Sequence, residues 1–279
     1  MSIIQGTAKS GGTVAASFYD YPIGDSLRFD GSSYLSRTPS TAGNQRTWSF
    51  SCWVKRSVSE QHNILTAYTS ASDTTNIAFD YGSGENLQWY DYISGYRIQL
   101  TSTQKFRDVA GWYHLLFALD TNQATSSYRA KIYVNGVRVT DFVEEIYPSQ
   151  NADLKMNTTI QHRIGNSDQH DRTFAGYMSD VYFIDGQALD PYFFGEFKDN
   201  IWVPYNAFST AGSGTATASD GGTATDSYGT NGFRLAFDSA DFNWSGSSTM
   251  TDPYGSGTAV PIYGVADASG NGKHWVMNS

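Results

Sequence analysis

The sequence predicts an all-β protein, an antiparallel two-sheet β-sandwich, and two observations carry this prediction. Aromatic residues make up 15% of the chain, and 27 glycines accompany only 7 prolines. Tyr, Thr and Val favour strands, whereas Gly, Asn and Asp favour tight turns. In addition, residues 177–184 alternate apolar side chains on both faces before an Asp-Gly turn at Asp185. A strand that is apolar on both faces belongs inside a layered structure.

A hairpin over residues 130–140 supports the antiparallel arrangement. Asn135 and Gly136 can adopt the positive φ angles of a type I′ turn. A two-residue loop places two sets of four side chains on opposite faces, with Ile132, Val134, Val137 and Val139 on one and Lys131, Tyr133, Arg138 and Thr140 on the other. We therefore expect one buried and one solvent-exposed face.

The chain divides into four predicted segments. Residues 1–25 form an extended N-terminal docking arm, and residues 26–208 form the jelly-roll sandwich, which includes a short helical turn at 190–197. Residues 209–231 are rich in Gly, Ser and Thr and are expected to form a loop or linker. Residues 232–279 are expected to form a C-terminal β-hairpin extension, and its start echoes residues 27–30 as a degenerate repeat.

Charge and cysteine content exclude several classes of protein. The formal net charge is −9 and the pI is near 4.9, so a polyanion is repelled and nucleic acid is not expected as a partner. Cys52 is the single cysteine, so no disulfide forms within the chain and a buried structural thiol is expected. The sequence shows neither a leader pattern nor an apolar run of about 20 residues, which predicts a soluble protein without membrane insertion.

Two sets of apolar residues near the chain ends are candidates for docking on a partner. They are Ile3, Ile4, Phe18, Tyr19, Tyr21 and Ile23 in the arm, and Phe233, Leu235 and Phe237 in the extension. The arm is either a free leader or a segment that docks on a neighbouring subunit. The strand near Phe233 either adds to its own sheet or to a neighbour's edge. We expect a homo-oligomer, with a trimer favoured.

Five segments, in this order, resemble the laminin-G/concanavalin-A-like jelly roll. Residues 26–35 are similar to its opening strand and turn, residues 47–55 to its second core strand, and residues 111–120 to its Trp-x-His strand. The hairpin at Asn135 resembles its Tyr-Val-Asn-Gly hairpin, and residues 176–189 resemble its closing strand. Residues 267–275 resemble the start of a second such domain, which the chain does not complete.

A narrower resemblance points to structural proteins of tailed bacteriophages, often marine ones. It is carried by Met-Ser-Ile-Ile-Gln-Gly at residues 1–6, by residues 34–39 and by residues 181–191. The resemblance implies a virion structural protein, a capsid decoration, fibre or tail appendage, that attaches to other virion proteins at the virion surface. Adhesion to a host-surface polysaccharide is a further role that it allows. A free carbohydrate-binding lectin and a polysaccharide-degrading enzyme are the alternatives.

The sequence lacks the patterns of catalytic residues that enzymes on this fold carry. Related hydrolases carry alternating carboxylates on one strand, whereas Glu144 and Glu145 are adjacent and face opposite ways. His162 and His170 do not place two metal ligands on one strand face, and His114 lies in an apolar strand as a core histidine. We therefore expect a protein that is not an enzyme and has no cofactor, with calcium as the one open case.

Calcium is a candidate because members of the fold often bind it at the sandwich rim. Four residues supply suitable oxygens in that part of the chain: Asn166, Asp168, Asp171 and Asp180. Ordinary turn chemistry accounts for the same residues equally well.

Sugar binding is the sharper hypothesis, and it centres on residues 89–97. The candidate residues are Trp89, Tyr90, Asp91, Tyr92, Tyr96 and Arg97. Strand alternation puts Trp89 and Asp91 on one face and Tyr90 and Tyr92 on the other, and one of these faces should be exposed. Aromatic rings can stack on sugars while charged groups bind hydroxyls. The alternative is a subunit interface or a plain surface, since tyrosine-rich surfaces serve there as well.

Overall fold

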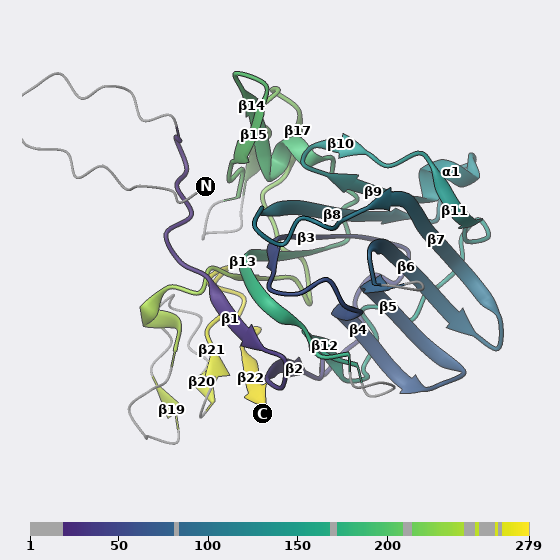
Figure 1. Cartoon of the computed structure of the whole chain (residues 1–279), viewed down its shortest axis with the longest axis horizontal. Helices are drawn as coiled ribbons and strands as arrows, with labels where there is room; N and C mark the ends of the chain where they lie inside the picture. The colour runs from purple at the N-terminus through teal and green to yellow at the C-terminus, as the bar shows by residue number, and fades with distance from the viewer. Residues whose placement is uncertain are drawn as a thin grey trace, which may run out of the picture.

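Two large antiparallel sheets form the body of the protein, which confirms the predicted β-sandwich (Figure 1). The computed structural model describes residues 19–80, 84–167, 172–208, 214–242, 249–250, 260–261 and 264–278. Helical structure in these residues is limited to α1 (Ser126–Arg129), η1 (Pro191–Phe193) and η2 (Ser239–Asp241). None of these helices has the length and apolar character needed to cross a membrane.

The first sheet has seven strands built around the long β13. Its order is β1 (Leu27–Asp30), β13 (Ala175–Asp185), β3 (Thr47–Arg56), β8 (Tyr113–Asp120), β9 (Ala130–Val134) and β10 (Val137–Arg138), and β18 (Phe233–Leu235) also pairs with β13. Asp180 has a φ of 46°, and the register of β13 against β3 shifts between Ser179 and Tyr182. On the opposite edge of β13, β1 pairs before this irregularity and β18 pairs after it. The two short strands that echo each other in sequence thus follow one another along the same strand.

The second sheet has nine strands. Its order is β11 (Phe142–Ile146), β7 (Tyr96–Lys105), β6 (Asn86–Ile93), β5 (Asp73–Asp80), β4 (His62–Ser70), β12 (His162–Ile164), β2 (Tyr34–Arg37), β22 (Trp275–Asn278) and β21 (Gly264–Val265). Three two-stranded pairs complete the described chain: β14 (Gly195–Lys198) with β15 (Ile201–Pro204), β16 (Thr215–Thr217) with β17 (Thr223–Thr225), and β19 (Thr249–Met250) with β20 (Val260–Pro261).

The main hydrophobic core lies between the two sheets. Trp48 of β3 packs against Trp89 of β6, with ring centroids 5.3 Å apart, and Trp89 meets Phe117 of β8 edge to face. Cys52 is also buried in this core, and burial raises the pKa of its thiol. Removing such aromatic surface from water is the main favourable contribution to folding.

A second core covers the outer face of the seven-stranded sheet. It consists of Leu116, Tyr182, Ile184, Leu189, Phe193, Phe194, Phe208, Ala216, Ala218 and Tyr228, with Tyr133 packed against it. The expectation of a solvent-exposed face around Tyr133 is therefore wrong, because residues from 189–208 and 214–228 lie over it. The described part of the Gly/Ser/Thr-rich stretch, residues 214–231, contains β16 and β17 and contributes to this core. It packs on the sandwich and does not act as a linker.

The C-terminal residues complete both sheets of their own chain. Phe233, Leu235 and Phe237 are at most 3% exposed and belong to the main core, so their prediction as partner-docking residues is wrong. Trp275, 1% exposed, belongs to the same core, and β22 pairs with β2. The segment that resembles the start of a second domain is thus part of this sandwich.

The described part of the arm is fastened to the same chain. The Tyr21 hydroxyl donates to Asp180 Oδ1 at 3.3 Å and accepts a hydrogen bond from Arg234. Lys198 Nζ lies 2.6 Å from Asp20 Oδ2. Tyr21 therefore docks on its own sandwich, while Tyr19 and Ile23 are half-buried. The predicted docking residues Ile3, Ile4 and Phe18 lie outside the described residues.

The hairpin at Asn135 forms as predicted, with one exception. Asn135 and Gly136 have φ angles of 48° and 78°, and Val134 pairs with Val137. Val137, however, is 62% exposed, whereas it was expected to be buried. The reason is that β10 is a two-residue strand at the edge of its sheet.

Candidate functional site

The outer face of strands β4 to β7 carries a group of tyrosine and amide side chains. Strand register places Tyr68, Thr74 and Tyr92 in one row across β4, β5 and β6. A neighbouring row contains Asn76, Tyr90 and Gln99. We call this surface the tyrosine face and define it as Tyr68, Thr74, Asn76, Gln88, Tyr90, Tyr92, Tyr96 and Gln99.

Three tyrosines form a cluster where β6 ends and β7 begins. The Tyr96 ring meets Tyr92 and Tyr90 edge to face, with centroids 5.0 Å and 6.1 Å apart. Tyr96 is 48% exposed, and its two partners are half-buried. Burial raises the pKa of Tyr90 and Tyr96, so their hydroxyls stay protonated at neutral pH and can both donate and accept hydrogen bonds.

A hydrogen-bonded layer of amides and hydroxyls supports these rings. Asn76 Nδ2 donates to Asn63 Oδ1 at 2.7 Å, and Asn76 Oδ1 accepts from the Thr66 hydroxyl at 3.2 Å. Gln88 Nε2 donates to Thr101 Oγ1 at 3.0 Å. The network holds its side chains in set orientations beneath the rings, which lowers the entropy lost when a ligand binds.

The other predicted sugar-binding residues lie elsewhere, which corrects that prediction. Trp89 is fully buried between the sheets, so its ring cannot stack on a sugar. Asp91 is also fully buried, and it accepts hydrogen bonds from Arg97 Nε at 2.8 Å and from the backbone amide of Lys155 at 2.9 Å. The inward positions of β6 thus belong to Trp89 and Asp91, and the outward positions to Tyr90 and Tyr92.

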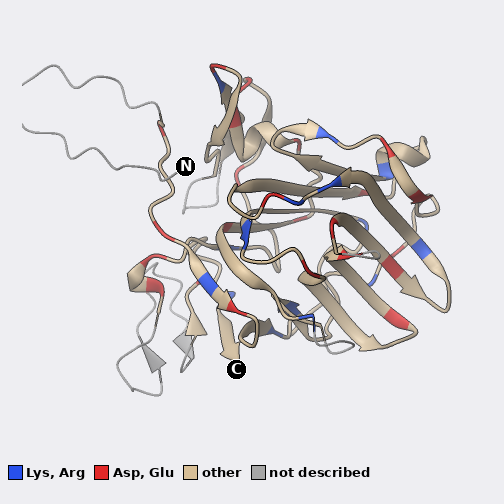
Figure 2. Cartoon of the chain, in the orientation of Figure 1, with Lys and Arg blue, Asp and Glu red and all other residues tan. Residues whose placement is uncertain are grey.

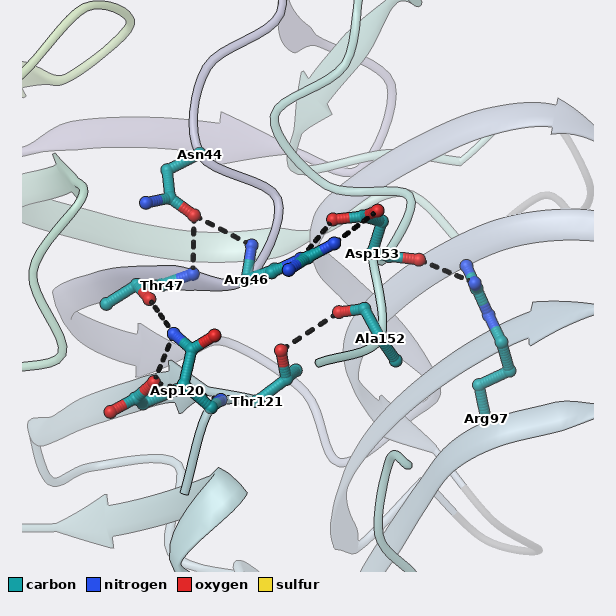
Figure 3. Close-up of polar contacts among 9 residues, drawn as sticks. Asn44, Arg46, Thr47, Arg97, Asp120, Thr121, Ala152 and Asp153 are labelled. Carbon is teal, nitrogen blue, oxygen red and sulfur yellow. Dashed lines mark hydrogen bonds and ion pairs between the residues drawn. The ribbon is translucent and has the colours of Figure 1, made fainter. Parts of the chain in front are cut away.

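Arg97 serves to hold a loop at the sandwich rim (Figure 3). Its Nη1 donates to the backbone carbonyl of Asp153 at 2.6 Å, and the carboxylate of Asp153 pairs with Arg46 Nε at 2.6 Å. The hydroxyl of Thr121 donates to the carbonyl of Ala152 at 3.0 Å in the same region. Asp91 and Arg97 therefore position residues 150–157 and do not extend the tyrosine face.

Of the four predicted calcium ligands, the structure describes Asn166 and Asp180, and both take part in side-chain hydrogen bonds. Asp180 accepts hydrogen bonds from Arg234 Nε at 3.0 Å and from the hydroxyls of Tyr21 and Tyr182, so its oxygens are used in a buried ion pair. Asn166 donates to the hydroxyl of Thr173. Asp168 and Asp171 lie outside the described residues, as does His170. Within those residues, no group of three or more His, Cys, Asp or Glu side chains could hold a metal ion.

A serine–histidine pair is present, but its geometry does not suit nucleophilic catalysis. Trp202 Nε1 donates to His114 Nδ1 at 3.0 Å, so the proton of the neutral ring is on Nε2. Nε2 then donates to Ser51 Oγ at 2.8 Å and cannot accept its proton. Burial also lowers the pKa of His114 to about 3. This pair is a buried structural contact, as expected for a core histidine.

The sequence signal for the tyrosine face was incomplete. The cluster of Tyr90, Tyr92 and Tyr96 is visible as a tyrosine-rich segment. Tyr68 and Asn76 come from two other strands, and only the pairing register brings them beside that segment. Alternation alone could not tell which face of β6 was exposed, since both carry aromatic rings.

Comparison with known proteins agrees with the fold. The family model described as "Concanavalin A-like lectin/glucanases superfamily" matches residues 29–191. A search of curated protein sequences gives no match.

Among solved structures, similarity is low. Domain 4 of an extracellular arabinanase from Geobacillus stearothermophilus, in complex with arabinotriose, shares 20% identity, with 65% of this chain and 79% of that chain covered and a TM-score of 0.47. A heptameric pentraxin from Limulus polyphemus shares 16%, with coverages of 58% and 76% and a TM-score of 0.42. The tailspike protein 2 of an Escherichia coli O157:H7 bacteriophage shares 10%, with coverages of 57% and 23% and a TM-score of 0.40. At these values the likenesses carry no inference about ligand or partner. The family match spans more than half of the chain, and the protein belongs to the concanavalin A-like lectin/glucanase superfamily.

Proposed function

We propose that the protein is an adhesion module of a virion structural protein, and that it binds host-surface glycan through the tyrosine face. One observation carries the adhesion part: the outward positions of β4 to β7 hold half-exposed tyrosine rings above a fixed layer of amides and hydroxyls. Rings with an apolar body and a polar tip can stack on sugars, and the tyrosine hydroxyls can bind sugar hydroxyls, while the amides of Asn76, Gln88 and Gln99 are buried beneath them.

The virion part rests on the sequence resemblance of residues 1–6, 34–39 and 181–191 to tailed-phage structural proteins. Under this proposal, the chain attaches to other virion proteins, is displayed at the virion surface and forms a homo-oligomer, with a trimer favoured. A free lectin would have the same tyrosine face and differ only in location. Detection of the chain and its copy number in purified particles separates the two, and absence from particles would favour the free lectin.

We infer that the module acts by binding and not by bond cleavage. The orientation of the His114 proton supports this, because it leaves Ser51 without a base. Incubation of the protein with any glycan that it binds should leave the glycan chain length unchanged. Shortening of the chain would overturn this inference.

Glycan binding is tested with one tyrosine of the face and one matched tyrosine outside it. We expect Tyr92→Ala to weaken binding to glycans identified on an array by about tenfold, the size expected for a tyrosine that anchors an interface. Tyr128→Ala is the control, since Tyr128 is 51% exposed on α1. Titration calorimetry measures both. Equal affinity of wild type and Tyr92→Ala would contradict a role for this face.

A further inference from the structure

The charges around the tyrosine face bear on the class of glycan it accepts, an inference that rests on the proposed function. The groups that define the face are phenol hydroxyls, carboxamides and one threonine hydroxyl, and none is charged. Such groups match sugar hydroxyls, which also donate and accept hydrogen bonds. A carboxylate or sulfate on a glycan needs a cation or several N–H donors to replace its hydration.

The described cations near these strands are already engaged. Arg172 Nη1 lies 2.5 Å from Asp80 Oδ2, and Arg97 Nε lies 2.8 Å from Asp91 Oδ1. Arg163 lies over the ring of Tyr34, with its guanidinium carbon 4.8 Å from the ring centroid. A carboxylate or a ring already faces each of these positive charges, which weakens their attraction for an anionic sugar.

Carboxylates border the same surface. Glu144 of β11 accepts a hydrogen bond from Thr101, which pairs with Gln88 of the face. Asp80 is at the end of β5, and its negative charge, like that of Glu144, acts on Tyr96. The whole chain has a formal net charge of −9, with acidic and basic residues interspersed over the body (Figure 2). The positive charge of Arg172 also acts on Tyr90, but Asp80 balances it. Glu144 therefore leaves the surroundings of the face negative, as the whole chain is, and an anionic ligand is repelled.

The row of Tyr68, Thr74 and Tyr92 also indicates the length of the ligand. Tyr68 and Tyr92 lie on strands separated by β5, which places them about 10 Å apart at the usual strand spacing. The short side chain of Thr74 lies between them and is 2% exposed. This span exceeds one sugar ring, so two stacking tyrosines would contact different sugar units of one chain.

From these observations we infer that the tyrosine face selects uncharged oligosaccharides of at least two sugar units that lie across strands β4 to β7, and that it discriminates against glycans with carboxylate or sulfate groups. A glycan carboxylate or sulfate bound at this face would lose water without gaining a cation partner, and the nearby carboxylates would repel it. Both effects oppose the binding of an anionic glycan.

The test uses pairs of glycans that differ only in charge. Suitable probes are hexagalacturonate and its methyl ester, sialyllactose and its carboxyl methyl ester, and a sulfated galactan and its desulfated form. We expect the neutral member of each bound pair to bind at least about tenfold more tightly, and its affinity to change less than twofold between about 0.05 M and about 0.5 M NaCl. Tighter binding of the anionic member that is lost in Tyr92→Ala would overturn the inference while leaving the adhesive face in place. Failure of all probes, or binding insensitive to Tyr92→Ala, would overturn both.

A gain-of-function variant provides a second measurement. Gln99→Lys puts a cation beside Tyr90 on the outer face, and because Gln99 is only 9% exposed, urea denaturation first checks that the variant folds as wild type does. We expect it to raise the affinity for the anionic member of a pair by about fivefold or more at low salt and to lose this gain at high salt. Gln99→Met is the matched control, since it keeps the length of the side chain without charge. Equal anionic binding by both variants would contradict the assignment of selectivity to charge at this face.

Discussion

The outer faces of the two sheets differ in what covers them. On the seven-stranded sheet the outward positions include Leu116, Tyr182 and Ile184, and residues from 189–208 and 214–228 bury them in a second core. On the nine-stranded sheet the outward positions of β5 and β6 include Asn76 and Tyr90, and the face keeps exposed aromatic surface such as that of Tyr96. The polarity of the outward residues thus indicates which face becomes a core and which remains available for a ligand.

Trp202 shows how closely the covered face is packed. Its indole donates to His114 and stacks on that ring with centroids 5.7 Å apart. A Cβ atom added at Gly136 or Gly195 would lie 2.4 Å or 2.2 Å from the Trp202 side chain, so both positions need glycine. On the tyrosine face, by contrast, the side chain of Tyr92 is only half-buried.

The largest expected effect is therefore on the covered face. Trp202→Ala should lower the free energy of unfolding by about 3–5 kcal/mol, because it leaves a cavity and a buried His114 nitrogen without a donor. Urea denaturation followed by circular dichroism measures the change. A loss under about 1 kcal/mol would mean that residues 189–228 contribute little to the fold.

An intermediate effect, about 2 kcal/mol for His114 alone, is expected from mild acid between pH 6.5 and pH 5. Burial lowers the pKa of His114 to about 3, below its ordinary value of 6.5, so the unfolded chain binds a proton in a range where the folded chain does not. Stability is then fully present above pH 6.5 and falls by about 1.4 kcal/mol per pH unit as the pH drops toward 3. His62 and His162, whose pKa values are lowered to about 4, act in the same direction.

Urea denaturation at pH 7, 6 and 5 tests this dependence. Trp202→Ala should show a shallower slope than wild type, because water that reaches His114 would bring its pKa back toward 6.5. Identical slopes would show that residues 189–228 do not keep His114 neutral.

The smallest effect is expected at the tyrosine face. Tyr92→Ala should change the free energy of unfolding by less than about 1 kcal/mol, because the side chain is half-buried and lies outside both cores. The same urea measurement, made beside the binding titration, separates ligand binding from folding. A loss above about 2 kcal/mol would show that the face is structural, and would remove the contrast between the two faces.

Local pattern predicted much of the fold. The Asn135-Gly136 turn and the strand around residues 177–184 depend on neighbours in sequence, and both are present. The helical turn predicted at 190–197 is shorter, because only Pro191–Phe193 are helical and Gly195–Lys198 form β14. Asp190 accepts from the backbone amide of Tyr192 at 3.0 Å, as its place before Pro191 predicts.

The errors share one cause, which is that burial depends on partners distant in sequence. Val137 is at a position that the alternation pattern predicts to be buried, but it lies on an edge strand and is exposed. Trp89 is of a residue type that often binds sugars, but its side chain faces the core. Phe233 was predicted to dock on a partner, with its strand adding either to its own sheet or to a neighbour's, and the structure pairs it with Phe183 of β13 in its own chain.

The sequence by itself determined the strand-and-turn content, the antiparallel hairpin and the sandwich class, because these follow from alternation and turn chemistry over a few residues. Three features came only from the tertiary structure: which tyrosines are exposed, the cover of one sheet by residues from 189–208 and 214–228, and the completion of the sandwich by its own C-terminal strands. These features depend on register and on contacts between distant segments, and a one-residue change of register would reverse every assignment of face.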